Sequence, residues 1–114
     1  MASVSRIQLY EATAITGDVN SSASVLEGLQ TDLIAYIDVS ACHADTTVSC
    51  DIEHSADGTN WLTLISMTNV VGAASREAKS ITDFALPKVR AAITLAGATK
   101  SATVEVDLFY DKKR

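Results

Sequence analysis

Hydrophobic and polar residues alternate with a period of two along most of this 114-residue chain, which is the pattern of half-buried β-strands. Four segments show it clearly, at residues 31–40, 46–55, 88–96 and 101–110. We expect each segment to turn one face toward a core and the other toward solvent. The predicted core-facing residues are Leu33, Ala35, Ile37, Val39, Val48, Cys50, Ile52, Val89, Ala91, Ile93, Leu95, Val104, Val106, Leu108 and Tyr110.

Weaker signals extend this pattern to other parts of the chain. Three further strands are predicted, at residues 5–12, 61–66 and 80–86, the last of them ending before Pro87, the only proline. The polar residues 16–24 cannot bury much surface, so we expect them to cross between sheets or to run along a sheet edge.

Two connections are predicted less directly. Residues 68–80 lack a clear period and predict either a loop or a short helix around residues 75–79. The short polar segment around Gly97 predicts a hairpin between the strands at 88–96 and 101–110.

The number and spacing of these elements indicate the fold class. Six to eight short strands, separated by turn signals about every 8–12 residues, are typical of all-β sandwiches and barrels. We therefore predict a single antiparallel β-sandwich of the jelly-roll or immunoglobulin-like type. The chain length suits one domain, so residues 1–114 are taken as one unit. An N-terminal arm is expected at residues 1–6 and a short, solvated basic tail at residues 111–114.

Composition excludes several classes of function. Nine basic and fourteen acidic residues give a net charge of −5, which repels a phosphate backbone, so nucleic acid is not an expected partner. No apolar run approaches the roughly 20 residues of a membrane helix, and the pattern of a signal peptide is absent, so we expect no membrane partner. In the reducing compartment that this implies, Cys42 and Cys50 are expected to remain free thiols.

The candidate metal ligands Cys42, His43, Cys50 and His54 lie within thirteen positions. Their spacing argues against a zinc site, because adjacent side chains diverge and residues four apart on a strand are about 13 Å from each other. We predict no metal and no cofactor, with Cys50 as a buried structural thiol. Since the chain has no nucleophile elbow and no glycine-rich phosphate loop, we also predict that it is not an enzyme.

The segment HSADGTNW at residues 54–61 combines a tight-turn signal with the only tryptophan. Gly58 can supply the positive φ of a hairpin turn, while Ser55 and Asp57 can accept hydrogen bonds from backbone amides. Trp61 would then cover the hairpin. We interpret the segment as a structural turn, and a ligand platform is the alternative.

This turn resembles the Asp-box hairpin of sialidases and other β-propellers, on the residues Ser55-x-Asp57-Gly58-x-x-Trp61. The Asp box has one more residue between its Asp and its Gly, and it repeats in successive blades. A single copy cannot build a propeller, so the resemblance implies a structural hairpin and no sialidase activity.

Most of the chain also resembles the small β-sandwich structural proteins of tailed bacteriophages. The resemblance is most distinctive in the strand that leads through Ser55 to Trp61, in Val89-Arg90-Ala91 ahead of Gly97, and in the strand at 103–110. It implies a virion component, namely a head decoration or cement protein that binds the major capsid protein without covalent bonds. Its place would be the capsid surface, and the host cytoplasm during assembly.

Such a module needs rigid strands, exposed edges and weak contacts repeated by symmetry. We expect the partner contacts in the N-terminal segment through Leu9 and in residues 68–80, with Arg6 and Arg76 as ion-pair donors. Flexible ends without a partner are the alternative for these residues. A homo-oligomer is expected, and a trimer is favoured.

A second hypothesis comes from a different class of function. The chain would be a carbohydrate-binding or receptor-binding module of a phage tail or adsorption structure, with Trp61, Tyr36 or Tyr110 stacking on sugar rings. The aromatic content of 5% counts against it.

Overall fold

The computed structural model describes residues 3–26 and 32–112, and every regular element in these two ranges is a β-strand. No helix in this part of the chain could therefore cross a membrane. The strands are β1 (Ser3–Ile15), β2 (Val19–Asn20), β3 (Ser24–Val25), β4 (Leu33–Cys42), β5 (Thr47–Ser55), β6 (Leu62–Ser66), β7 (Val70–Val71), β8 (Ser75–Ile81), β9 (Lys88–Ala96) and β10 (Ala102–Lys112).

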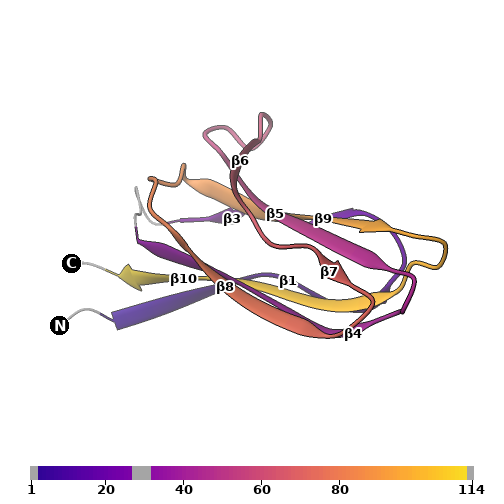
Figure 1. The fold of residues 1–114 in the computed structure, drawn as a ribbon. Coiled ribbons are helices and arrows are strands. Elements are labelled where there is room, and N and C mark those ends of the chain that lie inside the picture. Colours follow the sequence, from indigo (N-terminus) through magenta and orange to yellow (C-terminus); the bar gives the residue numbers. More distant parts are fainter. Residues whose placement is uncertain (1–2, 27–31, 113–114) are drawn as a thin grey trace.

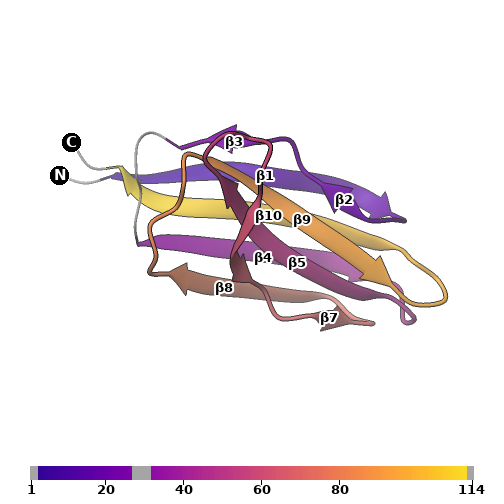
Figure 2. The same ribbon diagram turned by 90° about the horizontal axis from the view of Figure 1, so that it is seen from above.

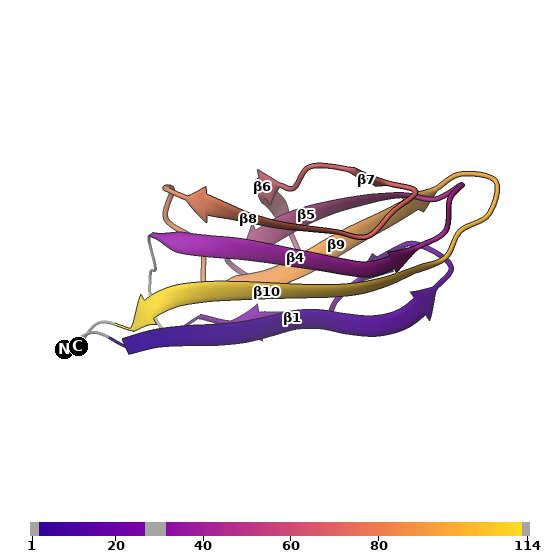
Figure 3. The same cartoon turned by 60° about the horizontal axis from the view of Figure 1, so that its bottom comes forward.

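The strands form two antiparallel sheets packed face to face (Figures 1 and 3). The four-stranded sheet has the order β1-β10-β4-β8. The six-stranded sheet has the order β2-β9-β5-β6, with β3 also paired to β9 and β7 to β5. The predicted antiparallel β-sandwich is confirmed. Its ten strands exceed the six to eight expected because β2, β3 and β7 have only two residues each, too few to leave a periodic signal.

Alternation along the long strands builds the core between the sheets. All fifteen residues predicted to face the core are buried, including Leu33, Ile52, Val106 and Leu108, whose exposed fractions are 0%. Most of these side chains are aliphatic, so the sheets are joined by close packing with few polar groups between them. This part of the prediction is confirmed residue by residue.

The predicted hairpin around Gly97 is wrong, because β9 and β10 belong to different sheets. The segment between them crosses from one sheet to the other beside a second crossing, between β4 and β5. Thr46, which is fully buried, ties the two crossings together: its hydroxyl donates to the carbonyl of Thr99 at 2.6 Å and accepts from the N–H of Ser101 at 3.1 Å. A local turn signal cannot specify which sheet the next strand enters.

The segment at residues 75–79 belongs to strand β8, so the predicted short helix is wrong. The predicted strand at 80–86 is also wrong beyond its first two residues, which end β8. The helix was predicted because Glu77 and Lys79 occupy inward positions of β8, opposite Ile37 and Ala35, so hydrophobic alternation is missing. Their side chains bond instead to Thr68, which follows β6, and to Ser66, the last residue of β6.

The predicted N-terminal arm at residues 1–6 also needs correction. Ser3 to Arg6 are part of β1 and pair with residues 109–112 of β10, so backbone hydrogen bonds hold them in the sheet. Residues 111 and 112 of the predicted basic tail likewise belong to β10. Residues 1–2 and 113–114 lie outside the described ranges.

The polar residues 16–24 run along an edge of the six-stranded sheet, as one of the two predicted alternatives (Figure 2). Between the short strands β2 and β3, the Ser21 hydroxyl accepts a hydrogen bond from the N–H of Ala91 at 2.8 Å and donates to the carbonyl of Ser22. The serine side chain thereby continues the edge of the sheet where strand pairing is interrupted.

Gly97→Ala tests the crossing between β9 and β10. Gly97 has a φ of 121°, and a Cβ added there would overlap the carbonyl oxygen of Asp45. We expect the substitution to lower the free energy of unfolding by at least about 1–3 kcal/mol in chemical denaturation. Gly17→Ala is the matched control, because nothing lies within 4 Å of its added Cβ. Equal stabilities of the two variants would contradict this account.

Candidate functional site

The four-stranded sheet has one face toward the core and one toward solvent, and the solvent side is here called the outer face. It displays the strand positions that do not enter the core. Antiparallel pairing aligns these positions in rows across the sheet. The rows are Arg6, Phe109, Ile34 and Ser80; then Gln8, Asp107, Tyr36 and Ala78; then Glu11, Glu105, Asp38 and Arg76. Carboxylates therefore occupy the central strands, with an arginine on each edge strand.

Arg6 on β1 binds two carboxylates of β10. Its guanidinium contacts Asp107 at 3.0 Å and also Glu105, while Gln8 donates to Glu105 at 3.2 Å. The side chain of Asp107 is only 3% exposed, although it points outward. Burial raises the pKa of Asp107, as does the neighbouring Glu105, and Arg6 opposes both effects. Arg6 is thus the counter-ion of a largely buried carboxylate.

Arg76 on β8 makes a looser ion pair at the other edge of the sheet. Its Nε lies 3.4 Å from Asp38, and its side chain is 73% exposed. An exposed pair of this kind contributes little to stability. Arg76 is therefore free to exchange its partner for a group on another molecule at small cost.

Apolar side chains lie between the two arginines. The rings of Tyr36 and Phe109 meet edge to face, with centroids 6.4 Å apart and planes at 76°. Ile34 beside them is 43% exposed, which is unusual for a large aliphatic residue in the middle of a sheet. The outer face thus combines an apolar centre with charged edges, a composition found at protein interfaces.

Two small hollows lie on the outer face. One, of about 220 Å³, is lined by the carboxylates of Glu11, Asp38 and Glu105 and by neighbouring hydroxyls. The other, of about 290 Å³, lies beside Arg76 and Ser40. Both are below the 300–1,000 Å³ that is usual for small-molecule sites. The outer face therefore suits a broad contact better than an enclosed ligand.

The three predicted partner contacts fall in different places. Arg6 and Arg76 both lie on the outer face, on its two edge strands. The prediction for Leu9 is wrong for the folded chain, since Leu9 is only 5% exposed and belongs to the core. Leu9 was predicted because it lies near the start of the chain, but in β1 it alternates with exposed Gln8 and therefore faces the core.

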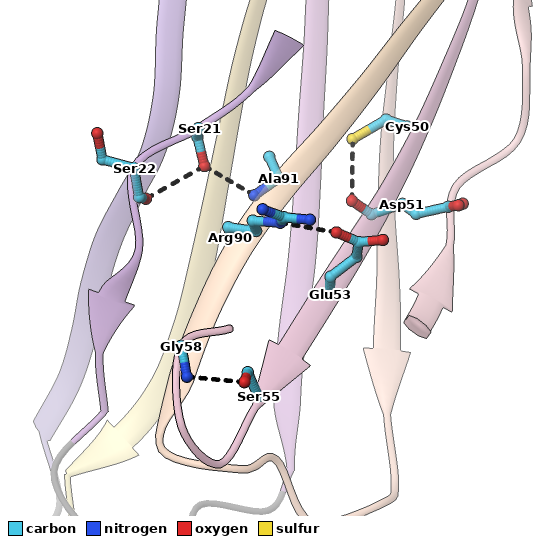
Figure 4. Close-up of polar contacts among 9 residues, drawn as sticks. All are labelled: Ser21, Ser22, Cys50, Asp51, Glu53, Ser55, Gly58, Arg90 and Ala91. Atoms are coloured by element: carbon cyan, nitrogen blue, oxygen red, sulfur yellow. Dashed lines mark hydrogen bonds and ion pairs between the residues drawn. The ribbon is translucent and has the colours of Figure 1, made fainter. Parts of the chain in front are cut away.

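The segment HSADGTNW forms the turn between β5 and β6. The Ser55 hydroxyl accepts a hydrogen bond from the N–H of Asp57 and another from the N–H of Gly58. Figure 4 shows the bond to Gly58, which has a φ of 82°. The Asp57 carboxylate accepts from the N–H groups of Thr59 and Asn60 and from the Asn60 side chain. These bonds hold the turn without any ligand.

Trp61 lies on Arg90, a contact that the sequence pattern did not reveal. The guanidinium carbon of Arg90 is 4.3 Å from the centre of the Trp61 ring, and Arg90 Nε donates to Glu53 at 2.7 Å. Figure 4 shows Arg90 and Glu53 reaching toward each other from β9 and β5. One face of the indole is therefore covered by a cation. The contact could have been predicted only if the pairing of β5 with β9 were known, because that pairing places Arg90 beside Glu53.

The cysteines and histidines serve the fold individually. Cys42 and Cys50 are both free, and burial raises the pKa of Cys50 to about 12, so its thiol is unreactive at neutral pH. His43 Nδ1 accepts from the N–H of Asp45, and His54 Nδ1 from the N–H of Leu86. Within residues 3–26 and 32–112, no three His, Cys, Asp or Glu side chains are grouped to hold a metal ion.

Acid titration tests the turn. Hydrogen bonds from the N–H groups of Asn60 and Thr59, and from the side chains of Asn60 and Ser55, hold the pKa of Asp57 well below its ordinary value. The stability that they add is present above the ordinary Asp pKa of about 3.9 and is lost as the pH falls below it. We expect Asp57→Asn to lower the unfolding temperature at pH 7, and to make the decline between about pH 4 and pH 2 shallower than in wild type.

Glu11→Gln is the control for this titration, because Glu11 is exposed and makes no hydrogen bond or ion pair with the described residues. It should keep the wild-type slope. An acid decline of equal steepness in wild type and Asp57→Asn would contradict the role given to this carboxylate.

No protein-family model matches the sequence, and no curated protein sequence matches it. Solved structures do match. PBSX exported protein XepA is similar at a TM-score of 0.68 and 15% identity, over 96% of this chain and 38% of its own. A chain of the infectious bursal disease virus Gx strain is similar at 0.51 and 8% identity, over 96% of this chain and 32% of its own. A family 6 carbohydrate-binding module matches at a TM-score of 0.42 and 17% identity, over 96% of this chain and 94% of its own. The chain thus spans about a third of the first two structures and shares their β-sandwich fold.

Proposed function

We propose that this chain is a structural protein of a phage particle, a capsid decoration protein that binds the head without covalent bonds through its outer face. The observation that carries the proposal is the composition of this face. Exposed Ile34 and the Tyr36–Phe109 pair lie between ion pairs at both edges, and the hollows on this face are smaller than usual ligand sites. Such a surface fits another protein.

The rigidity of the outer face supports this function. Its four strands are joined by long runs of pairing, and each is anchored from below by core residues. A rigid surface loses little conformational entropy when it binds, so modest contacts suffice. On a shell that repeats the same site many times, weak contacts also gain from multivalency.

The partner in this proposal is the major capsid protein, and the location is the capsid surface. Arg76 would exchange Asp38 for a carboxylate of the capsid, while Arg6 would stay paired with Asp107 and contact the capsid through its exposed half. No cofactor, nucleic acid or membrane has a part in this function, and it includes no catalysis. The shared fold with a chain of the infectious bursal disease virus structure supports the proposal only at the level of architecture.

Binding to capsids tests the proposal. Purified protein added to undecorated capsids of the virus that encodes it should bind saturably, with the same occupancy at each symmetry-related position. Ile34→Glu should abolish co-sedimentation, because it places an unpaired charge at the apolar centre of the interface. Thr94→Glu is the matched control, since Thr94 is exposed on a strand of the other sheet. Both variants should melt near the wild-type temperature.

Absence of wild-type co-sedimentation would overturn the proposal. Equal binding of Ile34→Glu and Thr94→Glu would show that the outer face is not the surface that contacts the capsid.

A carbohydrate-binding role is the second candidate, because Trp61 lies at the surface end of a turn. Its ring already contacts Arg90 on one face, Tyr110 is only 7% exposed, and Tyr36 packs edge to face against Phe109. We expect no binding on a glycan array. Trp61→Ala should instead lower the free energy of unfolding by about 1 kcal/mol through the lost contact with Arg90. A glycan signal that Trp61→Ala abolishes would place this role ahead of decoration.

A further inference from the structure

Strand β8 is an open edge of the four-stranded sheet. It pairs with β4 along its whole length, from Leu33 opposite Ile81 to Val39 opposite Ser75, without a shift in register. No other described strand pairs with it. Its backbone groups on the far side therefore have no backbone partners among the described residues.

The other edges are less suited to pairing. The pairing of β1 with β10 is interrupted by two shifts of register, and the pairing of β6 with β5 is interrupted by one. β2, β3 and β7 have two residues each. Bulges, short strands and charged side chains, Lys above all, are the usual protection of sheet edges against further pairing. β8 has seven residues and no bulge, so its only protection is its charged residues, and their order decides whether a second copy can pair with it.

The sequence of β8, SREAKSI, is complementary to itself. When two copies pair antiparallel about Ala78, Glu77 of each lies opposite Lys79 of the other, and Arg76 lies opposite Ser80. A shift by two residues in either direction would place Glu77 against Glu77, or Lys79 against Lys79. Opposite charges across strands stabilise pairing and like charges weaken it, so this one register is selected.

Glu77 and Lys79 can each form a further hydrogen bond to a second copy of the chain. Glu77 accepts from the N–H and hydroxyl of Thr68, and Lys79 donates to the carbonyl of Ser66 at 2.9 Å. A carboxylate has about four acceptor sites and an ammonium three donors. Each group can therefore bind its counterpart on a second copy without releasing its present partner.

We propose that two copies of this chain associate through β8, in antiparallel register about Ala78, and form one continuous eight-stranded sheet. The contact is isologous, so it closes as a dimer with a two-fold axis at Ala78. It differs from the trimer that the sequence suggested. One seven-residue edge, roughly 24 Å long, gives a small interface, so the dimer is weak in dilute solution. The inference depends on the edge alone and does not require the proposed capsid role.

Disulfide trapping tests the register. In the proposed dimer the two Ala78 Cα atoms lie about 4.5–5.5 Å apart, within the range that a disulfide spans. Ala78→Cys should therefore give a covalent dimer under mild oxidation of the intact chain. Ser80→Cys is the matched control: it is exposed on the same face, but the two copies of this position would be about 14 Å apart. The wild-type chain reports any cross-linking through Cys42.

Charge exchange tests the pairing itself, within the Ala78→Cys background. Glu77→Lys should reduce dimer yield, with the dissociation constant raised roughly tenfold, because two attractive pairs become repulsive. Glu77→Lys combined with Lys79→Glu restores opposite charges and should restore the yield. Thermal melts check that each variant is folded. Cross-linking at position 78 no greater than at position 80, or no recovery in the folded double variant, would overturn the proposal.

Discussion

The burial of two aliphatic sheet faces against each other is the constraint on which the rest of this structure depends. Val106 and Leu108 from one sheet and Ile52 and Val89 from the other are fully buried. Because the side-chain period of a strand is two, a slip of one residue would expose such a face, so the core fixes the register of every long strand. Fixed registers in turn align the charged and aromatic rows of the outer face.

The crossings between the sheets satisfy the same constraint at one end of the molecule. The chain must pass between sheets from β4 to β5 and from β9 to β10, and polar backbone groups are buried where it does so. Thr46 lies in the first crossing and bonds to Thr99 and Ser101 in the second, and the N–H of Gly72 donates to the Thr46 carbonyl at 2.9 Å. One buried threonine therefore joins three connections, and close approach of backbone explains glycine at 72 and 97.

The sequence predicted the features that follow from local periodicity and missed those that follow from topology. The core faces were predictable because aliphatic residues recur at every second position. β8 was not, since its inward positions carry Glu77 and Lys79, whose partners lie on a distant connection. Leu9 was expected at a partner contact because it lies near the start of the chain, but that segment pairs as β1 and its alternation turns Leu9 into the core. The contact of Trp61 with Arg90 needed the pairing of β5 with β9.

The edge and the outer face can act together because they point in different directions. Pairing through β8 extends the sheet within its own plane, and the outer face of each copy stays uncovered on the same side of the dimer. A two-fold pair would then present two copies of Ile34 and two of Arg6 on one rigid surface. Binding of one copy would hold the second close to its site, which raises the overall affinity without a new contact. In the proposed dimer, the weak edge contact and the modest outer face would together give a capsid affinity that neither would give alone.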